Sequence, residues 1–131
     1  MLSANNPGNI RVAKAKWQGQ TGEEKGFVTF SSMAYGYRAM IILLQNYGKL
    51  YGCTTIAQIV DKWAPPQENN TIGYIRAVEN MTGFGANERI DLNDKQVICK
   101  LTAAMSRQEN GITADINAVH KGWQLAQSET V

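Results

Sequence analysis

The sequence predicts a mainly α-helical fold of about five helices with a small β-hairpin near the N-terminus. From Ser32 onward, apolar side chains recur at helical spacing in segments that begin at capping residues and end at Gly or Pro. Before Ser32, residues with strand preference flank a polar, Gly-rich stretch at 18–24, which is typical of a hairpin. The 131 residues, of which 44% are hydrophobic, suffice for one core, so we expect a single domain spanning 1–131.

The hairpin is expected to follow the turn-rich segment Asn5–Asn9. Ile10 and Val12 have the character of one strand, and residues 27–30 have that of the other. The polar stretch between them would form an exposed connection, with Glu23 and Glu24 near its tip. We expect the junction between this hairpin and the helices to form the binding cleft.

Each expected helix has a polar residue near its start and a Gly or Pro near its end. Thr55 with Gln58, and Asn93 with Gln96, have the spacing of a capping box. The expected limits are, in order, Ser32 to Gly48, Thr54 or Thr55 to the residue before Pro65, Asn69–Thr71 to Gly83, Asn93 to Gly111, and Thr113 onward.

The charge pattern excludes several function classes. The formal net charge is +2, and no run of five like charges occurs, which argues against a nucleic-acid-binding arm but suits an anionic cell-wall polymer. Residues 1–11 lack the basic flank and apolar stretch of a secretory signal, so we expect synthesis in the cytoplasm without a signal peptide. The longest apolar run, at 39–44, is too short for a membrane span.

Metal, cofactor and acyl-transfer chemistry are not indicated. Cys53 and Cys99 stand alone, as expected for reduced, packed thiols, although a disulfide is the alternative. His120 is the single histidine and has no neighbours at metal-ligand spacing. Neither a GxSxG nor a phosphate-binding GxxxxGK motif occurs. We therefore expect no metal and no cofactor.

Glu109 is the most informative carboxyl group, because it is predicted to lie at the end of the fourth helix, beside its apolar face. Partial burial and the negative end of the helix dipole both favour an uncharged acid at such a place. A carboxylic acid that retains its proton can protonate a leaving glycosidic oxygen. The alternative is an ordinary solvated Glu, with Asn110 and Gly111 forming a helix C-cap.

A second carboxylate and an aromatic wall would complete such a site. Glu23 could supply the carboxylate if the hairpin tip faces Glu109, but a solvated turn is the alternative. Segment 63–70 combines an aromatic ring, two prolines and several amides, and it fits a helix connection and a substrate wall equally well. The candidate sugar-stacking residues, each of which could instead be core, are Trp17, Tyr35, Trp63 and Tyr74.

Four segments resemble small phage and prophage proteins called virion structural proteins. The resemblance extends over most of the chain, from about Asn5 to Gly111, and its most specific blocks read NNPGNIR at 5–11 and WAPPQENNT at 63–71. The other two are FVTFSS at 27–32 and QENG at 108–111. This resemblance implies a phage origin and possible partners among virion proteins.

A more distant resemblance suggests a mechanism. Glucosaminidases and lytic transglycosylases of the lysozyme superfamily have an Asn-Asn segment, a Trp, a Thr-x-Glu in a hairpin and a Phe-rich strand end, in that order. Similar residues here are Asn5-Asn6, Trp17, Thr21-Gly22-Glu23 and 27–31. In that superfamily the helix that ends in the catalytic Glu precedes the Asn-Asn segment, whereas the similar helix here ends at Glu109. We therefore hypothesise a circularly permuted lysozyme-like domain.

Two functions follow as expectations. The first is a glycosidase or lytic transglycosylase that cleaves the β-1,4 link of peptidoglycan at the cell wall, with Glu109 as general acid and Glu23 assisting. The second is a non-catalytic virion or cell-wall-binding protein that keeps a lysozyme-like fold. The residues expected to contact glycan strands are Asn5, Asn6, Asn9, Arg11, Trp17, Trp63, Asn70 and Tyr74.

Overall fold

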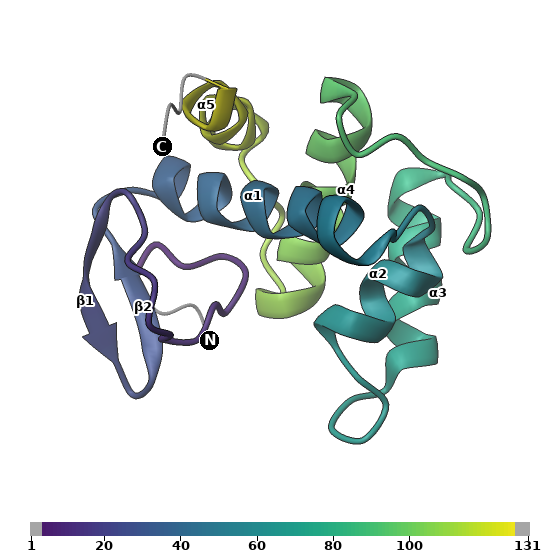
Figure 1. Cartoon of the computed structure of the whole chain (residues 1–131), viewed down its shortest axis with the longest axis horizontal. Coiled ribbons are helices and arrows are strands. Elements are labelled where there is room, and N and C mark those ends of the chain that lie inside the picture. Colours follow the sequence, from purple (N-terminus) through teal and green to yellow (C-terminus); the bar gives the residue numbers. More distant parts are fainter. Residues whose placement is uncertain (1–3, 128–131) are drawn as a thin grey trace.

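The computed structural model describes residues 4–127, and this part of the chain is mainly helical with one two-stranded hairpin (Figure 1). The prediction of a mainly α fold with a small N-terminal hairpin is therefore confirmed. The expected domain limits, residues 1 and 131, lie outside the described residues. The elements are β1 (Gln20–Glu24), β2 (Phe27–Phe30), α1 (Met33–Tyr51), α2 (Ile56–Trp63), α3 (Thr71–Thr82), α4 (Lys95–Asn110) and α5 (Ile116–Gln127).

The first hairpin strand differs from the prediction. The strand that pairs with β2 is β1, which is polar, and not residues 10–12. Residues 10–12 contact β2 through an isolated bridge between Arg11 and Phe27. Lys25 and Gly26 both have positive φ, at 52° and 85°, which is the backbone of a tight two-residue turn. Such a turn pairs β2 with the residues immediately before it, and β1 is too exposed to carry an apolar alternation.

The helix starts follow the capping residues closely. Side chains of Ser32, Thr55 and Asn70 accept hydrogen bonds from backbone N–H groups in the first turns of α1, α2 and α3. The start of α4 is a correction, because its N-cap is Asp94 rather than Asn93. The Asp94 carboxylate accepts from Val97 N at 3.2 Å.

The end of α1 is also a correction. The helix continues through Gly48 and stops at Gly52, whose left-handed backbone (φ 68°) lets its N–H bond back to Gly48. A glycine inside a helix costs only about 1 kcal/mol relative to alanine, so Gly48 alone could not end it. At Gly48 a Cβ would lie 3.1 Å from Leu92, so the residue serves close packing instead.

The core surrounds α1, which runs through the middle of the molecule with α5 packed across it (Figure 1). A Cβ at Gly122 of α5 would lie 2.8 Å from the Arg38 backbone nitrogen, so the two helices approach closely because this position is glycine. Fully buried side chains of α1, α2 and α4 fill the centre. The largest include Tyr37, Met40, Ile41, Leu44, Ile56, Ile59, Ile98, Leu101 and Met105.

The two cysteines are free and buried, and burial raises the pKa of both thiols. Over residues 4–127, no helix combines the length and the apolar character that crossing a membrane requires. Over the same residues, no cluster of three or more His, Cys, Asp or Glu side chains is placed to hold a metal ion.

Candidate functional site

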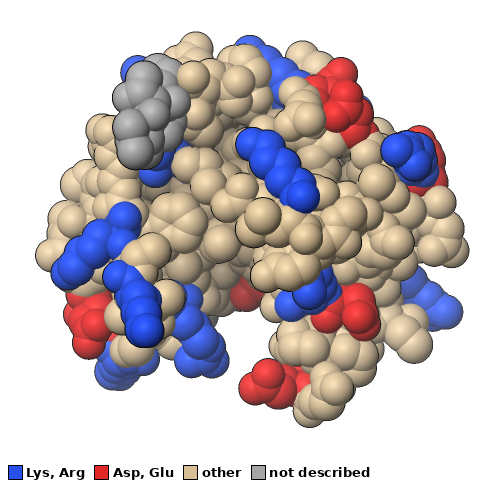
Figure 2. Space-filling view, viewed as in Figure 1, with Lys and Arg blue, Asp and Glu red and all other residues tan. Residues whose placement is uncertain are grey.

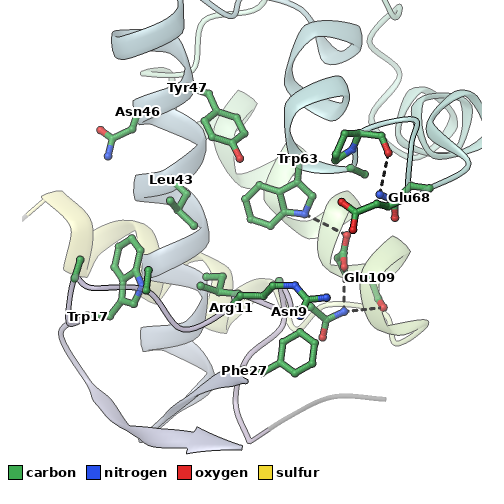
Figure 3. A pocket seen from close by; sticks show the side chains of 17 residues that line it. Asn9, Arg11, Trp17, Phe27, Leu43, Asn46, Tyr47, Trp63, Glu68 and Glu109 are labelled. Carbon is green, nitrogen blue, oxygen red and sulfur yellow. Dashed lines mark hydrogen bonds between the residues drawn. The ribbon is translucent and has the colours of Figure 1, made fainter. Parts of the chain in front are cut away.

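A cavity of about 760 Å³ lies where the N-terminal segment and the hairpin meet the helices. It is open to one side, and the surface view shows the corresponding hollow between two lobes (Figure 2). We call it the groove. It is lined by Gly8, Asn9, Ile10, Arg11, Ala13, Ala15, Trp17, Phe27, Leu43, Asn46, Tyr47, Trp63, Ala64, Pro65, Glu68, Asn69 and Glu109 (Figure 3).

Glu109 lies in the last turn of α4, half-buried, and its carboxylate contributes to the groove wall. Oε1 accepts a hydrogen bond from Asn9 Nδ2 at 3.0 Å. Oε2 accepts from Trp63 Nε1 at 3.1 Å and from the Tyr74 hydroxyl at 2.9 Å. Three donors from three separate segments therefore fix the orientation of this carboxylate. Figure 3 shows two of them, Asn9 and Trp63.

Hydrogen bonds connect the end of α4 to the N-terminal loop. Asn9, whose φ is 51°, also donates to the Glu109 backbone oxygen at 3.3 Å. Asn110 Nδ2 donates to Pro7 O at 3.1 Å. These bonds use backbone acceptors at the loop and at the helix end, where carbonyl groups lack intrahelical partners. They fix the position of the N-terminal loop, which forms one wall of the groove, relative to Glu109.

Tyr74 approaches Glu109 from inside the protein and is not among the groove-lining residues. It is 7% exposed. Burial, followed by the charge of Glu109 and the hydrogen bond to it, raises the Tyr74 pKa far above the ordinary value of 10.0. Tyr74 therefore remains a hydrogen-bond donor to Glu109 across the neutral and alkaline range.

Three tyrosines predict a loss of stability at alkaline pH. Burial raises the pKa of Tyr74, Tyr37 and Tyr47 above 10.0. Above pH 10 the unfolded chain releases these protons and the folded chain retains them, so the free energy of unfolding falls as pH rises. Tyr74→Phe should make that fall shallower. Urea unfolding between pH 8 and pH 11 measures it, and equal slopes for both proteins would contradict this assignment.

Aromatic rings line much of the remaining groove. Trp63 meets Tyr47 edge to face, with ring centroids 6.2 Å apart. Trp17 contributes from the N-terminal segment, away from Glu109, and Phe27 contributes from β2 (Figure 3). Flat apolar rings with polar edges, interspersed with Asn46 and Asn69, are suited to the faces and hydroxyl groups of sugars.

The structure brings together only part of the predicted glycan-contacting set. Asn9, Arg11, Trp17 and Trp63 line the groove together with Glu109. Tyr74 supports Glu109 from behind.

Three predicted contact residues have structural roles instead. Asn6 is fully buried and bonds to the backbone of Ile10 and Val28. Asn5 donates to the Phe30 carbonyl. Asn70 caps α3 by accepting from Gly73 N.

Two further sequence candidates lie outside the groove wall. Glu23 is exposed on β1, close to the hairpin turn, and is not among the lining residues. Tyr35 packs against Gly19 rather than lining the groove.

Sequence reasoning missed the contribution of α1 to the groove. Leu43, Asn46 and Tyr47 line it, although they flank the helix face that forms the core. The apolar periodicity of α1 identifies the buried face only, so it carries no signal for these positions. Glu68 and Asn69 also line the groove. They belong to segment 63–70, which was predicted as a possible substrate wall without naming these two residues.

The fold and the site together define a helical protein with an aromatic-lined groove and one fixed carboxylate at its wall. No family model matches the chain. The chain is 30% identical over 128 residues to "Protein P5" of Pseudoalteromonas phage PM2, covering 94% of this chain and 79% of that protein. The chain therefore belongs to the family of this phage protein.

Proposed function

We propose that this phage protein cleaves the β-1,4 glycosidic links of peptidoglycan, with Glu109 as the general acid. The observation that carries the proposal is the Glu109 carboxylate, held by Asn9, Trp63 and Tyr74 at the wall of an open groove. A carboxyl group with a fixed orientation beside an open groove meets the positional requirement for proton transfer to a leaving oxygen.

The groove suits a carbohydrate chain. Its openness to one side allows a polymer to enter without threading an end (Figure 2). Trp17, Tyr47 and Trp63 offer ring faces and edges, and Asn46 and Asn69 offer amide donors and acceptors. This combination matches a ligand whose pyranose faces are apolar and whose edges carry hydroxyl and acetamido groups.

The proposed reaction uses Glu109 twice. The Glu109 carboxyl group gives its proton to the leaving oxygen as the bond between that oxygen and the anomeric carbon breaks. A hydroxyl group of the same sugar forms the new bond to the anomeric carbon, and its proton returns to Glu109. Atoms and charge balance without water, and the product is an intramolecular anhydro sugar, as in lytic transglycosylases.

The transglycosylase reaction requires no second carboxylate. The alternative, hydrolysis with a second carboxylate as general base or nucleophile, would need that carboxylate within about 10 Å of Glu109 across the substrate. Glu23 is exposed on β1 and does not line the groove, so we assign it no role in the reaction. Glu68 is a second carboxylate that lines the groove, so hydrolysis with Glu68 assisting is the alternative that the product analysis tests.

The contact between α4 and the N-terminal loop supports a permuted lysozyme-like arrangement. In the superfamily that the sequence resembles, the catalytic helix ends just before the Asn-Asn segment. Here the end of α4 lies against that segment in space, through the bonds of Asn9 to Glu109 and of Asn110 to Pro7. The two elements could thus occupy the same relative positions with a different chain order.

Product analysis tests the proposal. Purified peptidoglycan sacculi are incubated with the protein, and the soluble fragments are identified by mass spectrometry. Fragments ending in anhydro-muramic acid, which lack one water relative to hydrolysis products, are the expected result. Reducing-end fragments would replace transglycosylation with hydrolysis. Sacculi that bind the protein but release nothing would favour a non-catalytic virion or cell-wall-binding role.

A further inference from the structure

We propose that Arg11, held over the ring of Phe27, forms a subsite for carboxylate groups carried by the glycan strand. The inference rests on the proposed function, since it concerns the same groove. It specifies the substrate class as glycans with acidic substituents, namely lactyl or peptide carboxylates, in preference to neutral glycans of the same length.

An aromatic ring holds the Arg11 side chain in place, and Arg11 forms no ion pair among residues 4–127. Its side chain lies on the groove wall, with Cζ 4.9 Å from the centroid of the Phe27 ring. Stacking on an aromatic face restricts the guanidinium while leaving its N–H donors free to bind. Figure 3 shows Arg11 and Phe27 adjacent, on the same side of the groove as Asn9.

Within the part of the chain that the structure describes, no carboxylate forms an ion pair with this cation. Among residues 4–127, Arg11 has no ion pair, and Glu109 is bonded instead to Asn9, Trp63 and Tyr74. Lys14 and Lys16 are exposed on the same segment. Several Lys and Arg side chains lie on the hairpin side of the hollow in Figure 2. The N-terminal wall is therefore electropositive, and it favours an anionic group on the ligand.

A planar guanidinium can bind a carboxylate through two parallel hydrogen bonds. On a peptidoglycan strand, carboxylates occur on the lactyl ether of peptide-free muramic acid and on the stem peptide. A strand in the groove would bring such a group to Arg11 while its sugar rings contact the aromatic wall. Neutral chitin oligosaccharides have the same β-1,4 backbone without any carboxylate, so they isolate the contribution of Arg11.

The test measures binding of three probes to the intact protein by calorimetry. The probes are chitotetraose, a peptide-free tetrasaccharide of alternating N-acetylglucosamine and N-acetylmuramic acid, and the same tetrasaccharide with stem peptides. We expect wild type to bind one or both acidic probes about three- to tenfold more tightly than chitotetraose. The acidic probe with the larger gain identifies the carboxylate source. The preference should weaken as salt is raised.

Arg11→Gln should remove this preference, lowering the affinity for the acidic probes far more than that for chitotetraose, and Arg11→Lys should retain only part of the preference. Arg76→Gln is the matched control, because Arg76 is exposed on α3 and does not line the groove. Circular dichroism and melting temperature establish that each variant is folded.

The outcomes separate the two proposals. Equal wild-type binding of all three probes would overturn the Arg11 subsite and leave glycan binding intact. An unchanged preference in Arg11→Gln would also overturn the subsite. Failure to bind any probe would overturn glycan recognition itself, and the subsite with it.

Discussion

Replacing Glu109 by glutamine should abolish the clearing of purified cell walls, lowering the rate by about 10²- to 10⁴-fold. Glutamine has nearly the same shape but has no proton to give to a leaving oxygen. Its amide oxygen can still accept from Trp63 and Tyr74, as Oε2 does in the native protein. The new amide NH2 replaces Oε1, so Asn9 Nδ2 loses that acceptor. The loss should therefore be larger in the rate than in glycan binding, because the aromatic walls keep their positions.

Glu23→Gln is the matched control for this substitution. Glu23 is exposed and outside the groove, so the variant should clear walls at the wild-type rate. Turbidity of a sacculus suspension measures both variants, and thermal unfolding verifies that both are folded. Equal clearing by wild type and Glu109→Gln would remove Glu109 from the mechanism, and a defect in Glu23→Gln would restore a second carboxylate.

Asn6→Ala should produce the largest loss of stability among the site-proximal substitutions, about 3–5 kcal/mol. The Asn6 side chain is fully buried and makes three hydrogen bonds, to Ile10 N, Ile10 O and Val28 O, at 2.8–2.9 Å. Alanine would leave Ile10 N without its acceptor and would remove one donor each from Val28 O and Ile10 O, although Ile10 O keeps its bond from Val28 N. The groove should suffer as well, because Asn6 fixes the loop that carries Asn9 and Arg11.

Urea unfolding measures this effect, with Asn93→Ala as the comparison. Asn93 is exposed at the start of α4, and its side chain makes no hydrogen bond to the described residues, so its loss should change the free energy of unfolding by under about 0.5 kcal/mol. If Asn6→Ala were as stable as Asn93→Ala, the three bonds could not be what holds the loop.

Much of the fold could be predicted because its signals are local. Capping side chains at Ser32, Thr55 and Asn70, and the terminal glycines Gly83 and Gly111, act within one helical turn. Their positions in the sequence therefore nearly fix the helix limits. The prediction for the first strand of the hairpin was wrong because β1 is polar and exposed. Its sequence therefore shows no alternation of apolar and polar residues.

The candidate site was only partly predictable. Glu109 could be singled out because a carboxyl group at a helix end beside an apolar face is a local pattern. Its partners could not, since Asn9, Trp63 and Tyr74 are 100, 46 and 35 residues away along the chain. Asn6 and Asn9 also look equivalent in sequence, yet one is fully buried and the other lines the groove.

The amino-acid sequence by itself determined the helical class, most helix limits and the position of one carboxyl group at the end of α4. These depend on periodicity and capping, which act over a few residues. Only the tertiary structure decided which asparagines face the groove, that Tyr74 supports Glu109 from behind, and that Arg11 lies over Phe27 without an ion-pair partner in residues 4–127. Those features depend on contacts between distant segments, and local side-chain preferences do not encode such contacts individually.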